Sequence, residues 1–207
     1  MSKLLSKDSF IIILIIFISF FFSVSYSLEQ HAIEGGLVIS GLVKYPEGYS
    51  VMKTAYFNGW TFLNQFAGLL LKLDLSSINA SRVILFFSTF FYFTGIYLAV
   101  RSISSSSILG FFIALTVIIF RKNFGDIDYP TLIFSVHTNG MMSLAMATFV
   151  FGLIANGNLF LAGFFSIFLV SIHPVIGIWI VSVVLFSILV TKIFSRNFII
   201  NKKIFYG

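Results

Sequence analysis

The sequence predicts an all-α, polytopic membrane protein, with about six transmembrane helices packed as a bundle in a single domain over residues 1–207. Of these residues, 58% are hydrophobic and only 10% are charged, whereas a soluble domain carries roughly 25% charged residues. The chain also contains 28 phenylalanines, too many for one soluble core of this size. Its mean hydropathy is +1.04. Most of the surface must therefore face lipid.

Six apolar stretches are candidate spans, because a transmembrane helix needs about 20 mostly apolar residues. They are predicted at about 10–28, 83–100, 104–120, 139–155, 159–172 and 175–194. The first follows Lys3 and Lys7, which resembles the basic start of a signal peptide, and Ser23, Ser25 and Ser27 near its end could form a cleavage site. An uncleaved first span is favoured, because the rest of the chain is also apolar.

The fourth and fifth candidate spans are joined only by Asn156, Gly157 and Asn158, which predict a tight turn. These two spans should therefore form an antiparallel helical hairpin. Small residues on both could let the two backbones approach closely. They are Ser143, Ala147, Gly152, Ala162, Gly163 and Ser166.

A long polar and aromatic loop, residues 29–82, interrupts the apolar chain. Within it, apolar residues recur at the spacing of one helix face: Met52, Tyr56, Trp60, Leu63, Phe66, Leu70 and Leu73. The opposite stripe is Thr54, Asn58, Thr61, Gln65, Gly68 and Lys72. This pattern predicts an amphipathic helix over 51–73 that lies flat on the membrane. Before it, Gly35, Gly36 and Gly41 bracket an apolar patch that is expected to remain loop. The segment is either a plain connection or a substrate-binding vestibule.

The distribution of lysine and arginine predicts a cytoplasmic N-terminus. With that orientation, the cytoplasmic segments carry seven basic residues and one acid, Asp8, whereas the outer segments carry six basic and six acidic residues. The loop 29–82 then lies outside, as do all three histidines.

Charge and residue types exclude several classes of function. The net charge of +6 falls at the ends of the predicted spans, where lipid head groups explain it, so nucleic acid is not an expected partner. The absence of cysteine excludes disulfides, thiolate metal sites and cysteine nucleophiles. The spans are expected to carry no buried ion pair, as a pump would need, and their polar residues are mostly serine and threonine.

Two motifs on the outer side could carry chemistry. Asp126 and Asp128 form an Asp-x-Asp pair, which could hold a divalent cation or be an ordinary solvated loop. His173 precedes Pro174 at the end of the fifth candidate span. It could bind phosphate, act as an acid or base, or simply cap a helix.

Acids directly after the first span are the other candidates. Glu29 and Glu34 flank His31 near the membrane surface, where a general base for a lipid-borne substrate would be needed. Glu34 is the preferred catalytic residue, because Gly35 and Gly36 leave room for a ligand beside the backbone. His31, Trp60 and His137 are candidate substrate-binding residues. If the protein is an enzyme, these groups should line one outer cavity; otherwise they should be scattered and solvated.

This arrangement resembles the N-terminal part of a GT-C type membrane glycosyltransferase. It consists of one span, a long outer loop that begins with acidic residues, a surface helix in that loop, and short spans that form a hairpin. The matching positions are Glu29 or Glu34 and the helix 51–73. The stretch 164–180 is similar to part of bacterial membrane proteins of this shape. The resemblance implies a bacterial plasma-membrane enzyme with an acidic catalytic residue and a polyprenyl-phosphate sugar substrate. The usual Asp-Glu pair is absent. The alternatives are a transporter, a non-catalytic subunit, or a fragment of a larger enzyme.

Overall fold

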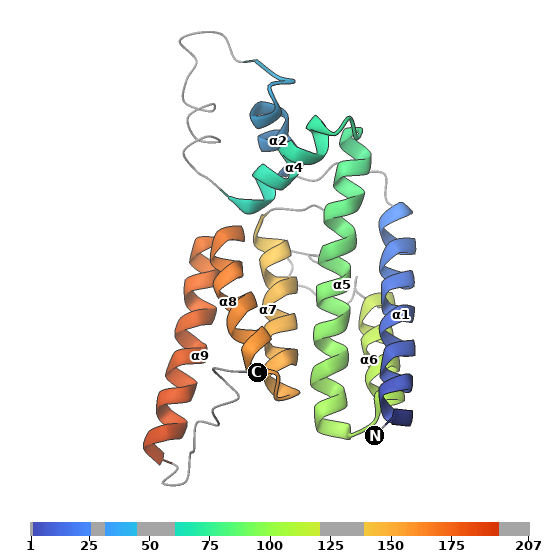
Figure 1. Cartoon of the computed structure of the whole chain (residues 1–207), viewed down its shortest axis with the longest axis vertical. Coiled ribbons are helices and arrows are strands. Elements are labelled where there is room, and N and C mark those ends of the chain that lie inside the picture. Colours follow the sequence, from blue (N-terminus) through green and yellow to red (C-terminus); the bar gives the residue numbers. More distant parts are fainter. Residues whose placement is uncertain (1, 26–31, 45–60, 121–138, 195–207) are drawn as a thin grey trace.

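The computed structural model describes residues 2–25, 32–44, 61–120 and 139–194. All secondary structure in these residues is helical, which confirms the predicted all-α class (Figure 1). The helices are α1 (Ser2–Val24), α2 (Ala32–Ser40), α4 (Phe62–Lys72), α5 (Ser77–Ser104), α6 (Ser107–Ile119), α7 (Asn139–Ala155), α8 (Leu159–Ile172) and α9 (Pro174–Phe194).

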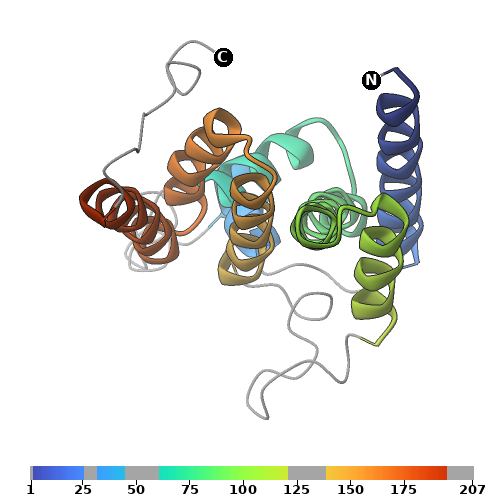
Figure 2. The ribbon, with the colours of Figure 1, turned by 90° about the horizontal axis from the view of Figure 1, so that it is seen from below.

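The long helices run up and down side by side, whereas α2 and α4 form a separate pair at one end (Figure 1). We call this pair the cap. Helix α5 is central: it packs against α1, α6 and α7. Helix α7 packs on α8, and α8 packs on α9, so the bundle is an extended row rather than a closed ring (Figure 2). We call the end of the bundle that carries the cap the cap end, and the other the network end.

The predicted spans correspond to helices. Helices α7 and α8 have the predicted bounds, and α6 and α9 lie within a few residues of theirs. Helix α5 is longer than predicted at both ends, because Ser76 caps its start and Ser105 ends it in a left-handed conformation at φ 55°. The next residue, Ser106, caps the start of α6. The serine-rich link therefore stops one helix and starts the next.

Only α5 is both long and apolar enough to cross a membrane on its own among the residues that the structure describes. The apolar parts of α1, α6, α7, α8 and α9 are shorter. Six helices thus occupy the six predicted stretches, and one of them meets the length and composition of a span.

Helices α5 and α7 cross where two glycines meet. A Cβ on Gly95 would lie 2.5 Å from the backbone carbonyl carbon of Thr148, and a Cβ on Gly152 would collide with the carbonyl oxygen of Gly95. The expected α7–α8 hairpin is confirmed. However, two of the small residues that were expected to let α7 and α8 approach closely do not lie between these helices. Gly152 packs on α5 instead, and Gly163 has no neighbour within 4 Å for a Cβ to meet.

The cap differs from the predicted loop in two ways. First, the apolar patch around Gly35 and Gly36 is the helix α2, because its glycines let it pack directly on α4. A Cβ on Gly36 would lie 2.7 Å from the Cβ of Ala67. Secondly, α4 starts at Phe62 rather than continuing from residue 51.

The start of α4 is set by Thr61, whose backbone is extended (φ −127°, ψ 145°) and whose side chain accepts a hydrogen bond from the Asn64 amide. The prediction of one continuous helix over 51–73 is therefore wrong, because the helix does not continue through Thr61. Residues 51–60 lie outside the described residues. Leu63 and Leu70 of the predicted apolar stripe are buried, but Gly68 of the opposite stripe is buried as well, and Leu73, past the helix end, is exposed.

Candidate functional site

The structure describes two of the predicted site residues, Glu34 and His173. The remaining ones lie outside the described residues: Glu29, His31, Trp60, Asp126, Asp128 and His137. A single outer cavity lined by all of these groups therefore stays a prediction.

Glu34 lies in the first turn of α2 and is exposed, although Ile33 and Gly35 on either side of it are buried. The buried neighbours fix α2 against α4, so the carboxylate projects from the packed side of the cap toward its surface. A carboxylate in the first turn also interacts favourably with the helix dipole. The same position is thus suited to stabilising α2 and to meeting a ligand.

His173 lies between α8 and α9 and is half-buried. Its backbone is extended (φ −147°, ψ 98°), Pro174 follows as the first residue of α9, and the Ile176 amide donates to Nδ1 at 3.4 Å. A side-chain acceptor three residues before the donating amide is the geometry of a helix N-cap. The capping interpretation is confirmed. Because Nδ1 accepts here, the neutral ring would carry its proton on Nε2.

Glu34 and His173 flank one hydrophobic cluster, which joins the cap to the bundle. Ile33, next to Glu34, and Ile172, next to His173, are both fully buried in it. The ring of Phe62 at the start of α4 packs edge-on against Phe168 of α8, with centroids 4.7 Å apart. The cap therefore rests on the end of α8, which brings the elements that carry both predicted residues to the same end of the molecule.

The described residues contain no group of three or more histidine, aspartate or glutamate side chains that could hold a metal ion. The proposed cation ligands, Asp126 and Asp128, lie beyond those residues.

A surface groove of about 510 Å³ opens between the last turn of α1 and the first turns of α5. Its lining residues are Phe20, Ser23, Val24, Leu75, Asn79, Arg82, Val83, Phe86 and Phe87. The sequence analysis did not single out this groove. The signal that could have found it is Arg82, a cation at the very start of a predicted span.

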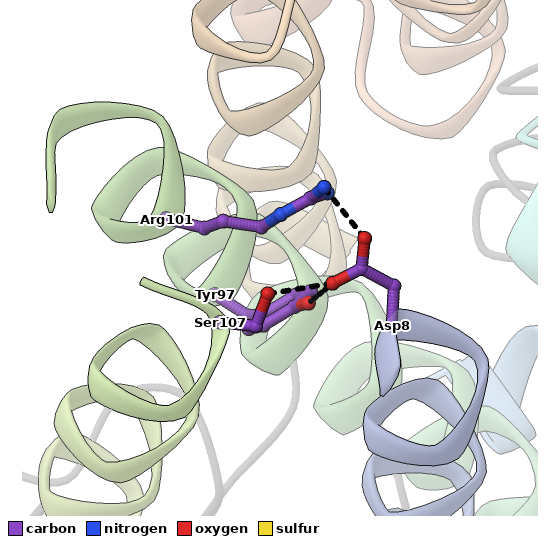
Figure 3. A network of polar contacts seen from close by, with 4 residues as sticks. All are labelled: Asp8, Tyr97, Arg101 and Ser107. Atoms are coloured by element: carbon purple, nitrogen blue, oxygen red, sulfur yellow. Dashed lines mark hydrogen bonds and ion pairs between the residues drawn. The ribbon is translucent and has the colours of Figure 1, made fainter. Parts of the chain in front are cut away.

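A polar network joins three helices at the network end of the bundle (Figure 3). Asp8 of α1 forms an ion pair with Arg101 of α5, with 2.5 Å between Oδ2 and Nη2. Its Oδ1 accepts hydrogen bonds from the hydroxyls of Tyr97, at 2.9 Å, and Ser107, at 2.7 Å. The Asp8 and Arg101 side chains are 20% and 27% exposed, so the pair is largely shielded from solvent.

This ion pair was not predicted, but it does not contradict the expectation that the spans carry no buried ion pair, because Asp8 and Arg101 lie just outside the predicted spans and are partly exposed. The pair forms because α1 starts earlier and α5 ends later than the predicted spans, which brings Asp8 and Arg101 into helices that pack together. Both residues were assigned to the same side of the membrane, so their pairing could have been inferred from the predicted topology.

Comparisons of the chain with protein-family models, curated proteins and solved structures gave no match.

Proposed function

We propose that the chain is a multi-pass integral membrane protein in which α1, α5, α6, α7, α8 and α9 all cross the bilayer. The observation that carries this proposal is the apolar outer surface of the bundle. Trp179 of α9 is 70% exposed and Phe17 of α1 is 67% exposed. Other large apolar side chains are exposed on the remaining outer helices: Phe112, Ile113, Phe151, Phe164, Ile167 and Phe186. Large apolar side chains exposed on every outer helix are typical of a membrane or partner interface.

The placement of charge supports the same proposal. Asp8 and Arg101 lie at the network end, whereas Lys72 and Arg82 lie in the cap and at the start of α5, at the cap end. Between them the described bundle presents apolar side chains, and its fully buried polar groups are hydroxyls such as Ser88, Thr89 and Ser143. A band without charge between two charged ends fits the hydrocarbon layer of a bilayer.

Helices α6 and α8 are short for membrane-spanning helices, so their lengths are the hardest observation for this proposal to explain. They contain 13 and 14 residues, which rise about 20 Å in an α-helix, against roughly 30 Å for the hydrocarbon core. A span this short requires the bilayer to thin locally or flanking residues to complete the crossing. Helix α8 therefore needs a test of its own.

Single cysteines test the topology, because the natural chain has none. We expect a membrane-impermeant maleimide to label Leu42→Cys, just after α2, and Val175→Cys at the start of α9 in intact cells. It should label Ile103→Cys and Asn156→Cys only after permeabilisation. All four positions are exposed. Labelling of residues 156 and 175 from the same side would show that α8 does not cross.

The protein's activity, we propose, is that of a GT-C-like glycosyltransferase core that acts on a lipid-linked sugar at the outer face. The support is that the cap packs on the cap end of the bundle, at the level where the head group of a lipid-borne substrate would lie, and presents the Glu34 carboxylate on its surface. In the proposed step, Glu34 takes the proton of an acceptor hydroxyl while that oxygen attacks the anomeric carbon. The lipid phosphate leaves with the electron pair of the broken bond.

Transfer can be measured on reconstituted protein with a polyprenyl-phosphate sugar labelled in the sugar. Glu34→Gln should abolish release of label from the lipid, because an amide cannot accept the proton, whereas Glu34→Asp should retain part of it. Lys72→Gln, also exposed on the cap, is the control and should leave release unchanged. Equal activity of Glu34→Gln and the natural protein would remove the catalytic role and favour a non-catalytic membrane subunit.

A further inference from the structure

We propose that α4 lies inside the outer leaflet of the bilayer, where one of its faces contacts the acyl chains of membrane lipids. The opposite face of α4 packs on α2, which lies on the outer side of α4 and so stays at the level of the lipid head groups (Figure 1). This inference rests on the membrane location proposed above but not on the glycosyltransferase activity. It places α4 deeper than a helix that lies flat on the membrane surface.

Helix α4 has two apolar faces. One is buried, and its Ala67 packs against Gly36 of α2. The other face, which we call the outer stripe, follows the spacing of a single helix face and consists of Phe62, Phe66, Leu69 and Leu73. The two phenylalanines of the outer stripe are half-buried, whereas Leu69 is 53% and Leu73 is 63% exposed. A surface helix in water carries polar side chains on its outward face, so the outer stripe requires an apolar partner.

The contact with α5 gives the depth of the outer stripe. The ring of Phe66 packs edge-on against Phe87 of α5, with centroids 6.2 Å apart. Phe87 follows Arg82 by five residues, which corresponds to a rise of about 7.5 Å in an α-helix. From residue 83 to residue 100, α5 carries no charged side chain. Phe66 therefore lies beneath the charged start of α5, at the level of its apolar segment.

The contact with α8 gives the same depth independently. The ring of Phe62 packs edge-on against Phe168, with centroids 4.7 Å apart. Phe168 precedes His173, the polar residue at the end of α8, by five residues, again about 7.5 Å. Helix α4 thus lies between α5 and α8 and below the polar ends of both (Figure 2). Interfacial helices bury their apolar face about 5–10 Å into the boundary with the acyl chains, so the acyl chains are the partner that this depth supplies.

The inference can be tested by attaching a nitroxide to single cysteines of the full-length protein in phosphatidylcholine vesicles. Its collisions are measured with oxygen, which concentrates in lipid, and with a water-soluble nickel complex. Leu69→Cys reports on the outer stripe, Phe164→Cys on α8 is the reference for lipid, and Leu42→Cys, just after α2, is the reference for water; all three positions are exposed. We expect the label at residue 69 to resemble the one at residue 164, with oxygen collisions several-fold more frequent than nickel collisions.

Lys72→Cys is the matched control, because it is exposed on the same helix but lies at its end and outside the outer stripe. We expect the nickel complex to reach residue 72 more readily than residue 69. A label at residue 69 that resembles the one at residue 42 would overturn the proposal and place α4 outside the bilayer. Protection of residue 69 from both reagents would also overturn it, because a protein partner would then cover the outer stripe. If the label at residue 164 is itself in water, the membrane location fails; if only the label at residue 69 is in water, this inference alone fails.

Discussion

The two ends of the bundle are held together by different interactions. At the network end, the Asp8 carboxylate connects α1 to α5 and α6 through directional polar contacts, and the Ser102 hydroxyl donates to the carbonyl oxygen of Ala155 at the end of α7. At the cap end, α2 and α4 pack through glycines and an apolar cluster on α8. The network end thus depends on a few polar atoms, whereas the cap end depends on the close approach of backbones.

The difference matters for where a ligand could be accommodated. A network of matched hydrogen bonds has few alternative arrangements that satisfy all its groups, so it fixes the relative positions of its helices. The apolar contacts of the cap end are not directional. The cap end also carries Glu34, the groove and His173. Nondirectional packing and candidate binding groups therefore coincide at one end.

The largest effect should come from the α5–α7 crossing, on which both ends depend. Gly95→Leu would push a side chain into the Thr148 backbone, which cannot rotate away. We expect a loss of about 3 kcal/mol or more, or no folded protein. Gly163→Leu is the matched control: the same change on α8 meets open space and should leave stability within about 0.5 kcal/mol. Unfolding by SDS in mixed micelles measures both.

The next effect isolates the network end. Arg101→Gln leaves Asp8 without its cation, and we expect it to cost about 2 kcal/mol, less than a fully buried pair because both side chains are partly exposed. The double variant with Asp8→Asn should recover part of that loss, since it removes the stranded charge. Additive effects in this double-mutant cycle would show that the two residues do not interact.

A smaller effect is expected in the cap, where two adjacent glycines differ in what they face. A Cβ on Gly36 would press on Ala67 and the Gly68 backbone, whereas the three atoms nearest to a Cβ on Gly35 all belong to the side chain of Asn64. Gly36→Ala should therefore cost about 1 kcal/mol. Gly35→Ala should be nearly neutral, because Asn64 can rotate and alanine gains up to about 1 kcal/mol in helix propensity. The same unfolding titration measures both, and the reverse order would contradict this account of the interface.

Local patterns predicted the helices of the bundle better than the cap. Apolar runs and the Asn156 to Asn158 turn placed α7 and α8 correctly, because these signals lie within the segment itself. The helix α2 was missed because glycine disfavours a helix in isolation. The glycines of α2 are needed for its close packing on α4. Because α4 is far from α2 in the sequence, no local pattern indicates this contact.

The candidate site shows the same limit. Glu34 and His173 were predicted from residue type and from position beside spans, and their elements do come to one end of the bundle. The role of His173 as a cap followed from its place before Pro174. The groove could not be predicted, since its lining combines the end of α1 with the start of α5, which are far apart in the sequence. The pairing of Asp8 with Arg101 was not predicted either. Each residue lies just outside a predicted span, and the helix that contains it extends beyond that span.

The smallest effect separates capping from catalysis at His173. Alanine removes the acceptor for the Ile176 amide, and the 3.4 Å contact is long, so His173→Ala should cost only about 0.5 kcal/mol. Asparagine is a good N-cap residue, so His173→Asn should restore that stability.

Asparagine cannot exchange a proton near neutral pH, however, so the same variant would not restore an acid or base. If His173→Asn is as stable as the natural protein and releases sugar from the lipid at the natural rate, His173 is a cap alone. If it is equally stable but inactive, the imidazole has a chemical role, and its Nε2 is the atom that would carry it, because Nδ1 is held by the start of α9. The pair of measurements therefore shows whether the cap end of the bundle contributes one candidate catalytic group, Glu34, or two.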